Sequence, residues 1–183
     1  MKFLKFLTFM FVIFSFSAMA QFSEMAVTGG FQTTGVDADS GASVDGGAGF
    51  FAGILGFIEL GNGSVLRSGA LLNQRKWEVD SSSSEYETLN LDVPITYMYM
   101  VNDIIGIFGG AKLGLNISDD CSKGTLSTCD TDPETIYYGG EIGGHFRFNP
   151  NFGVEAAFDI GLSDIADQLA WKNSLVIGAF FLF

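Results

Sequence analysis

The feature that most constrains the fold is a strict alternation of apolar and polar residues, over segments longer than the strands of most soluble proteins. The clearest segment spans residues 86–101. One face of a strand there carries Leu89, Leu91, Val93, Ile95, Tyr97 and Tyr99, and the other carries Thr88, Asn90, Asp92, Pro94 and Thr96. The next alternating segment follows after only Asn102 and Asp103, which suit a tight hairpin turn. Two antiparallel strands, each with one apolar face, are therefore predicted.

The same pattern along the chain predicts eight strands, over residues 23–34, 46–59, 64–78, 86–101, 104–118, 135–148, 152–161 and 171–183. Short connections are predicted at Gly61-Asn62-Gly63, Asn102-Asp103 and Asn149-Pro150-Asn151. They alternate with longer ones near 35–45, 79–85, 119–134 and 162–170. Up-and-down barrels of outer membranes alternate in this way, with tight periplasmic turns and longer external loops. We predict an all-β fold, an eight-stranded antiparallel up-and-down transmembrane β-barrel.

The first twenty residues have the organisation of an export signal. Lys2 and Lys5 precede an apolar run, and Ala18-Met19-Ala20 supplies small residues around a cleavage point. A membrane-anchoring helix is the alternative, but the run from Phe6 to Phe16 is shorter than the roughly 20 residues that a span requires. We expect a signal peptide over 1–20, cleaved after Ala20, and one barrel domain over 21–183.

The supply of charge favours lipid rather than water outside the barrel. A secreted lipocalin-like barrel would have a similar length and strand number. Only 16% of the chain is charged, against about 25% in typical soluble domains. Most acidic residues are assigned to the outer loops or their margins: Asp37, Asp39, Asp45, Asp80, Glu85, Asp119, Asp120, Asp130, Asp132, Glu134, Asp164 and Asp167. Too few charges remain to coat an aqueous wall.

Charged residues inside the predicted strands lie on the polar face and include both signs. Buried charges are tolerated only with partners, so we expect a structural ion-pair network in the lumen. Its predicted members are Arg67, Arg75, Asp92, Lys112, Glu141, His145, Arg147, Glu155 and Asp159. Near the periplasmic rim the same face turns apolar, which predicts an apolar floor of Leu55, Phe57, Met98, Met100, Ile104, Phe108, Phe180 and Leu182. The alternative is a slipped register in the second and eighth strands, where both faces are apolar.

Aromatic residues gather at both ends of the apolar bands, where membrane interfaces favour them. The predicted periplasmic belt contains Tyr97, Tyr99, Phe146, Phe148, Phe152, Phe181 and Phe183. The predicted outer belt contains Trp77, Tyr86, Tyr137, Tyr138 and Trp171.

Cys121 and Cys129 share one polar segment, and an exported chain meets an oxidising compartment. A disulfide closing that loop is the simpler interpretation, and a metal site is the weaker one because no His lies nearby. Removing Lys2 and Lys5 leaves seven basic residues against 21 acidic ones, a formal charge of −14. This charge disfavours binding to nucleic acid.

The chain resembles the small eight-stranded outer-membrane barrels of the OmpX/OmpA-like type, including the group described as outer membrane protein beta-barrel domain. The most specific element is Leu175 to Phe183, where apolar residues alternate up to a terminal Phe. The resemblance implies that Phe181 and Phe183 are read by the barrel-assembly machinery. The strand from Leu89 to Val101, with Pro94, looks like the family's central strand. No catalytic residue is carried over.

A monomeric barrel of eight strands is filled by its own side chains, which disfavours a general diffusion pore. We therefore expect a non-enzymatic protein of the cell outer membrane, embedded in lipid and without a cofactor. Its role would be in envelope integrity, or in contact with a surface partner through acidic loops. The alternatives are a narrow channel or small-molecule conduit, and a lipid-modifying enzyme. The enzyme has little support, because His145, the only His, has no serine two residues along.

Overall fold

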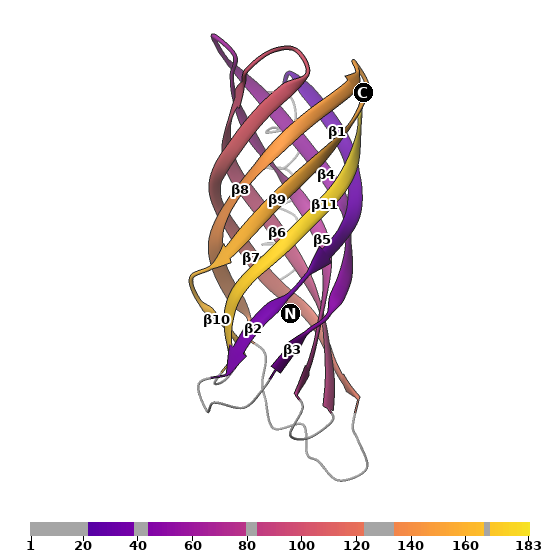
Figure 1. Ribbon diagram of the computed structural model, residues 1–183, viewed down its shortest axis with the longest axis vertical. Coiled ribbons are helices and arrows are strands. Elements are labelled where there is room, and N and C mark those ends of the chain that lie inside the picture. The colour runs from indigo at the N-terminus through magenta and orange to yellow at the C-terminus, as the bar shows by residue number, and fades with distance from the viewer. Residues whose placement is uncertain (1–21, 39–43, 80–83, 123–133, 167–168) are drawn as a thin grey trace, which may run out of the picture.

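The computed structural model describes residues 22–38, 44–79, 84–122, 134–166 and 169–183, and it is built from strands (Figure 1). The eight long strands are β1 (Glu24–Thr33), β4 (Ala48–Gly61), β5 (Ser64–Val79), β6 (Ser84–Met100), β7 (Ile105–Ser122), β8 (Ile136–Asn149), β9 (Phe152–Gly161) and β11 (Leu169–Leu182). The three short strands are β2 (Gly35–Ala38), β3 (Val44–Gly46) and β10 (Asp164–Ala166). No described helix is long and apolar enough to cross a membrane.

The long strands pair in chain order, each antiparallel to the next, and β11 pairs with β1 to close the cylinder. The closing register runs from Ala26 opposite Leu182 to Gln32 opposite Val176. Closure leaves no free sheet edge in the barrel wall, which satisfies the backbone where the protein meets lipid. The predicted fold class, an eight-stranded antiparallel all-β barrel, is confirmed.

Three short turns and the chain end Phe183 lie together at the upper end of Figure 1. Gly61, Asn62 and Gly63 all have positive φ, at 90°, 54° and 78°, which explains two glycines around an asparagine. The Asn102 side chain accepts hydrogen bonds from the backbone N–H groups of Ile104 and Ile105. Turns of this length mark the periplasmic end of an outer-membrane barrel.

The opposite end is less regular. β5, β6 and β7 extend beyond the other strands of the barrel (Figure 1). β8 begins at Ile136, opposite Leu115, whereas β7 continues to Ser122. Short strands β2 and β3 pair there with β11 and β5. The extracellular end is thus a set of projecting strands joined by the longer connections.

The ladder between β5 and β6 is interrupted at one place in the wall. Pairing stops at Ser68 opposite Ile95 and resumes in the same register at Leu71 opposite Asp92. Pro94 lies in the gap and has no N–H to donate. On its other side Pro94 still pairs with Lys112 of β7.

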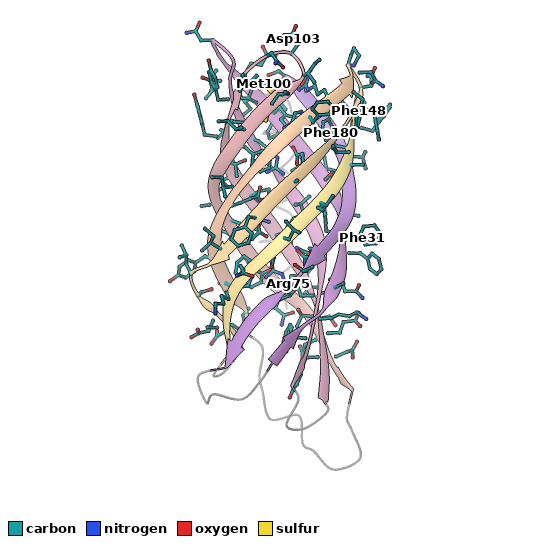
Figure 2. All side chains as sticks on the ribbon, viewed as in Figure 1. Phe31, Arg75, Met100, Asp103, Phe148 and Phe180 are labelled. Atoms are coloured by element: carbon teal, nitrogen blue, oxygen red, sulfur yellow. The ribbon has the colours of Figure 1, made fainter. Side chains whose placement is uncertain are left out.

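The two faces of the wall differ in polarity. Outward residues are large and apolar around the cylinder, among them Val27, Phe31, Ile54, Leu72, Ile95, Ile107, Leu113, Ile142, Phe158 and Ile177. Figure 2 shows Phe31 pointing away from the barrel and Arg75 within it. The interior holds the buried polar and charged side chains, so this protein is polar inside and apolar outside.

Candidate functional site

The centre of the lumen is built around Arg67 of β5. Its guanidinium donates to Glu141 of β8 at 2.8 Å and to Glu155 of β9 at 2.7 Å. The guanidinium also lies over the Phe108 ring, 4.5 Å from its centroid. One cation thus connects opposite sides of the wall and satisfies two buried carboxylates.

Lys112 of β7 continues the network away from the periplasmic end. Its ammonium lies 2.6 Å from a Glu141 oxygen and 2.7 Å from an Asp159 oxygen, and all three groups are buried. Glu141 therefore bridges Arg67 and Lys112, while Asp159 has Lys112 as its ion-pair partner among the described residues.

His145 and Arg147 of β8 continue the network toward the periplasm. Arg147 Nε donates to His145 Nε2 at 3.1 Å, so the His145 proton sits on Nδ1 and is donated to Glu155 at 2.9 Å. The imidazole stacks on Phe180 with a centroid separation of 4.3 Å. Arg147 also pairs with Glu24 of β1 at 2.7 Å. Both ring nitrogens are occupied, which leaves none to activate a nucleophile.

Arg75 and Asp92 form a second cluster closer to the extracellular end. Arg75 pairs with Asp92 at 3.0 Å, and Asp92 also accepts hydrogen bonds from Asn73 and from the Tyr137 hydroxyl. The Arg75 guanidinium lies 4.5 Å from the Tyr137 ring centroid and 4.4 Å from that of Trp171. All nine residues of the predicted network therefore face the interior, and each pairs with another charged residue.

Four aromatic side chains close the lumen on the extracellular side of Arg75, and we call them the aromatic cap: Trp77, Tyr86, Tyr137 and Trp171. Trp77 and Trp171 are each only 2% exposed. Trp77 stacks on Tyr86, and Tyr137 meets Trp171 edge to face. The prediction that these four residues belong to an interfacial belt is wrong, and only Tyr138 of that set faces outward.

The strand parity explains this correction. Three of the four lie on the inward face of their strands, since Trp77 is two residues from the buried Arg75. Tyr86 and Tyr137 are likewise an even number of residues from the buried residues Thr88 and Glu141 of their own strands. Their depth in the membrane therefore did not predict which face of the wall they occupy. Trp171 is inward for another reason, since a register irregularity between Trp171 and Asn173 shifts the alternation of β11 by one residue. The predicted periplasmic belt of Tyr97, Tyr99, Phe146, Phe148, Phe152, Phe181 and Phe183 does face outward.

The apolar floor lies at the periplasmic end of the lumen. Its buried members are Leu55, Phe57, Met98, Phe108, Phe180 and Leu182, with Met100 packed against them and Ala26, Phe51, Val65, Leu71 and Ala157 completing the cluster. Ile104 was predicted in the floor, but it is 48% exposed. The strand β6 ends at Met100 and β7 begins at Ile105, so Ile104 belongs to the turn that Asn102 holds.

Two small cavities lie among the side chains of the lumen. One, of about 20 Å³, is lined by Arg67, Asn73, Lys112 and their neighbours, and another, of about 10 Å³, by Arg75, Trp77 and Asn116. Each has room for about one water molecule. No group of three or more potential metal ligands occurs in the described ranges.

The extracellular end carries exposed acidic side chains, among them Asp119, Asp120, Glu134 and Asp164. Lys76 lies 2.9 Å from the Glu87 carboxylate, and its hydrogen bond lowers the pKa of Glu87, with a further contribution from Gln74.

Two predictions concern residues that the structure does not describe in full. Cys121 pairs through its backbone with Tyr86, but Cys129 lies outside the described residues, so the disulfide stays a prediction. The predicted signal segment 1–20 also lies outside them.

Sequence reasoning missed several contributors to the lumen. Glu24 lies at the start of β1 and was not recognised as the partner of Arg147. Gln32 of β1 and Asn73 of β5, the two strands that flank β4, hydrogen-bond at 2.9 Å. Asn73 shares strand parity with Arg67 and Arg75, so extending the polar face of β5 to uncharged side chains would have found it. Glu24 and Gln32 lie on β1, where no inward residue was predicted.

A model of the family described as outer membrane protein beta-barrel domain matches residues 17–167, which is more than half of the chain. The chain belongs to this family. It is accordingly an outer-membrane protein whose apolar outer wall is embedded in lipid.

Solved structures show the same fold. Ail, the attachment invasion locus protein of Yersinia pestis, is 17% identical and superposes with a TM-score of 0.56, over 87% of this chain and 98% of Ail. Neisserial surface protein A is 16% identical, with a TM-score of 0.56 over 86% of this chain and 95% of that protein. The structure of Ail in complex with the heparin analogue sucrose octasulfate superposes with a TM-score of 0.55 at 17% identity, over 87% of this chain and 98% of Ail. A search of curated protein sequences found no match.

Proposed function

We propose that this protein is a closed, non-enzymatic barrel that acts through its extracellular end, in surface contact or envelope integrity. The closed lumen is the observation that carries the proposal. Every charged residue of the network is engaged by another, and the two small cavities among the side chains of the lumen hold about one water each. A solute would have to break buried ion pairs, so the surface is left to carry the function.

The charge of the extracellular end favours a cationic partner. Asp119, Asp120, Glu134 and Asp164 are exposed there, and the connections between the strands contribute Asp39, Asp80, Asp130 and Asp132 from the sequence. Ail has been crystallised with a polysulfated sugar, which is an anionic ligand. An acidic surface repels such a ligand, so we propose the opposite preference for this chain.

The interfacial enzyme has no support from the geometry of His145. Its partners are Glu155, Arg147 and the Phe180 ring, and its side chain is buried inside the wall, away from lipid. We further propose that the barrel is a monomer and that Phe181 and Phe183, exposed on the final strand, serve in recognition by the assembly machinery.

Binding of the protein in nanodiscs to polylysine and to heparin tests the preference for a cationic partner. We expect polylysine to bind and heparin not to bind. A variant lacking residues 119–134 removes a large part of the acidic surface, so its polylysine binding should fall, and cells that carry it should lose surface adhesion. Glu59→Gln with Asp103→Asn, which removes two exposed acidic charges at the periplasmic end, is the control. Unchanged binding and adhesion after the deletion would contradict a surface role for this loop.

A further inference from the structure

The periplasmic mouth of the barrel holds an open depression of about 480 Å³, on the opposite end from the surface considered above. It lies among the short turns, and Figure 2 shows Met100, Asp103 and Phe148 gathered at this end. Its volume falls within the range of about 300 to 1,000 Å³ that is usual for ligand sites. The barrel therefore presents a concave surface to the periplasm.

The base of this depression is apolar. Phe57, Val65, Met100 and Ile104 line it, and Phe57 and Val65 belong to the buried cluster of the floor. Because the apolar floor separates the depression from the lumen, the depression is closed on that side, and we call it the cup. These four side chains offer van der Waals contact to a ligand.

The edge of the cup is acidic. Glu24, Glu59, Asp103 and Arg147 line it, and Arg147 is already paired with Glu24 at 2.7 Å. Neither Glu59 nor Asp103 forms an ion pair among the described residues, and both are exposed. Two carboxylates thus remain at the edge without a cation of their own.

The cup is preorganised. The Asn102 side chain holds the β6–β7 turn through the N–H groups of Ile104 and Ile105. Asn149 holds the β8–β9 turn in the same way, through the N–H groups of Asn151 and Phe152 at 2.9 Å each. Turns fixed by their own side chains lose little conformational freedom when a ligand binds.

We propose that this cup binds a polypeptide segment of a periplasmic partner that carries a lysine or arginine next to an apolar side chain. The apolar side chain would contact Met100 and Ile104, and the cation would pair with Glu59 and Asp103. A basic polypeptide fits better than an uncharged glycan, because it brings a cation for Glu59 and Asp103 together with an apolar side chain for Met100 and Ile104. Charge complementarity selects a basic segment over an acidic one.

The test uses the full mature protein in phosphatidylcholine nanodiscs, whose zwitterionic lipid does not attract a basic peptide. The methyl groups of Met100 and Ile104 are observed by NMR during titration with Ac-Lys-Leu-Lys-NH2, with Ac-Glu-Leu-Glu-NH2, or with an uncharged N-acetylglucosamine oligosaccharide. The paired variants are Glu59→Gln with Asp103→Asn at the cup, and Asp119→Asn with Asp120→Asn at the extracellular end. Both pairs keep side-chain size and lie on exposed residues, and SDS–PAGE mobility checks that they fold.

We expect the basic peptide to shift both methyl signals and the acidic peptide to leave them unchanged. The cup variant should weaken binding about threefold to tenfold, since each exposed ion pair contributes modestly, and the extracellular variant should bind like the wild type. Equal binding of both peptides, equal binding by the cup variant, or no shift at these methyl groups would overturn the proposal. Binding of the oligosaccharide alone would overturn it in favour of a glycan. None of these outcomes depends on the extracellular surface.

Discussion

Replacing Lys112 by methionine tests whether the ion network holds the lumen together. The Lys112 ammonium lies 2.6 Å from Glu141 and 2.7 Å from Asp159, and all three side chains are at most 2% exposed. Without it Glu141 keeps Arg67, but Asp159 loses its ion-pair partner, and one of its oxygens already lacks a hydrogen bond among the described residues. Breaking a buried pair by removing one partner costs about 3 to 5 kcal/mol, and we expect a loss of that size in the free energy of unfolding.

The assay is urea unfolding in lipid vesicles, followed by the fluorescence of Trp77 and Trp171. Lys76→Met is the matched control, because the Lys76 side chain is 31% exposed and pairs with Glu87 at the extracellular end. Losing an exposed ion pair of this kind should lower the free energy of unfolding by only about 0 to 1 kcal/mol. Adding Asp159→Asn to Lys112→Met removes the unpaired charge and should recover at least half of the loss. A Lys112→Met variant as stable as the Lys76→Met variant would refute the reasoning.

Three further predictions follow from single features. Pro94→Val supplies a backbone N–H group at the gap in the β5–β6 ladder, so the free energy of unfolding in urea should rise by about 0.5 to 1.5 kcal/mol. A destabilised variant would show that the packing of Pro94 contributes more than the missing hydrogen bond. Trp77 and Trp171 are buried in the aromatic cap, so their fluorescence emission should be blue-shifted and should resist quenching by iodide. Efficient quenching would show instead that both side chains are exposed, as the interfacial belt had predicted. Mass spectrometry of the exported protein without reductant should give a chain beginning at Gln21, two hydrogens lighter than the dithiol, and free thiols at Cys121 and Cys129 would contradict the predicted disulfide.

The long strands and their short turns followed from the sequence because a period of two fixes both face and length. The segment 86–101 was found within two residues of β6, and the glycines around Asn62 marked a turn with positive φ. The charged residues of the lumen followed from the same parity. Their pairing did not, because which side chains meet depends on the barrel's register and not on any one strand.

The errors have local physical causes. Trp77, Tyr86 and Tyr137 were placed by depth although their parity put them inside, and Trp171 was displaced by a register irregularity that no sequence pattern marks. Ile104 was assigned to a strand because a two-residue turn was assumed, whereas Asn102 holds a longer one. The depression at the periplasmic mouth had no sequence signal, since its lining comes from several turns and strands.

Single-channel recording in planar bilayers tests most directly whether the lumen is closed. With the ion network intact between the aromatic cap and the apolar floor, we predict no discrete conductance steps from the wild-type protein in physiological salt. A variant that opens both closures, Trp171→Ala with Phe57→Ala and Phe180→Ala, serves as the positive control and should show small steps if it folds. Steps from the wild type that match those of the opened variant would contradict a sealed barrel.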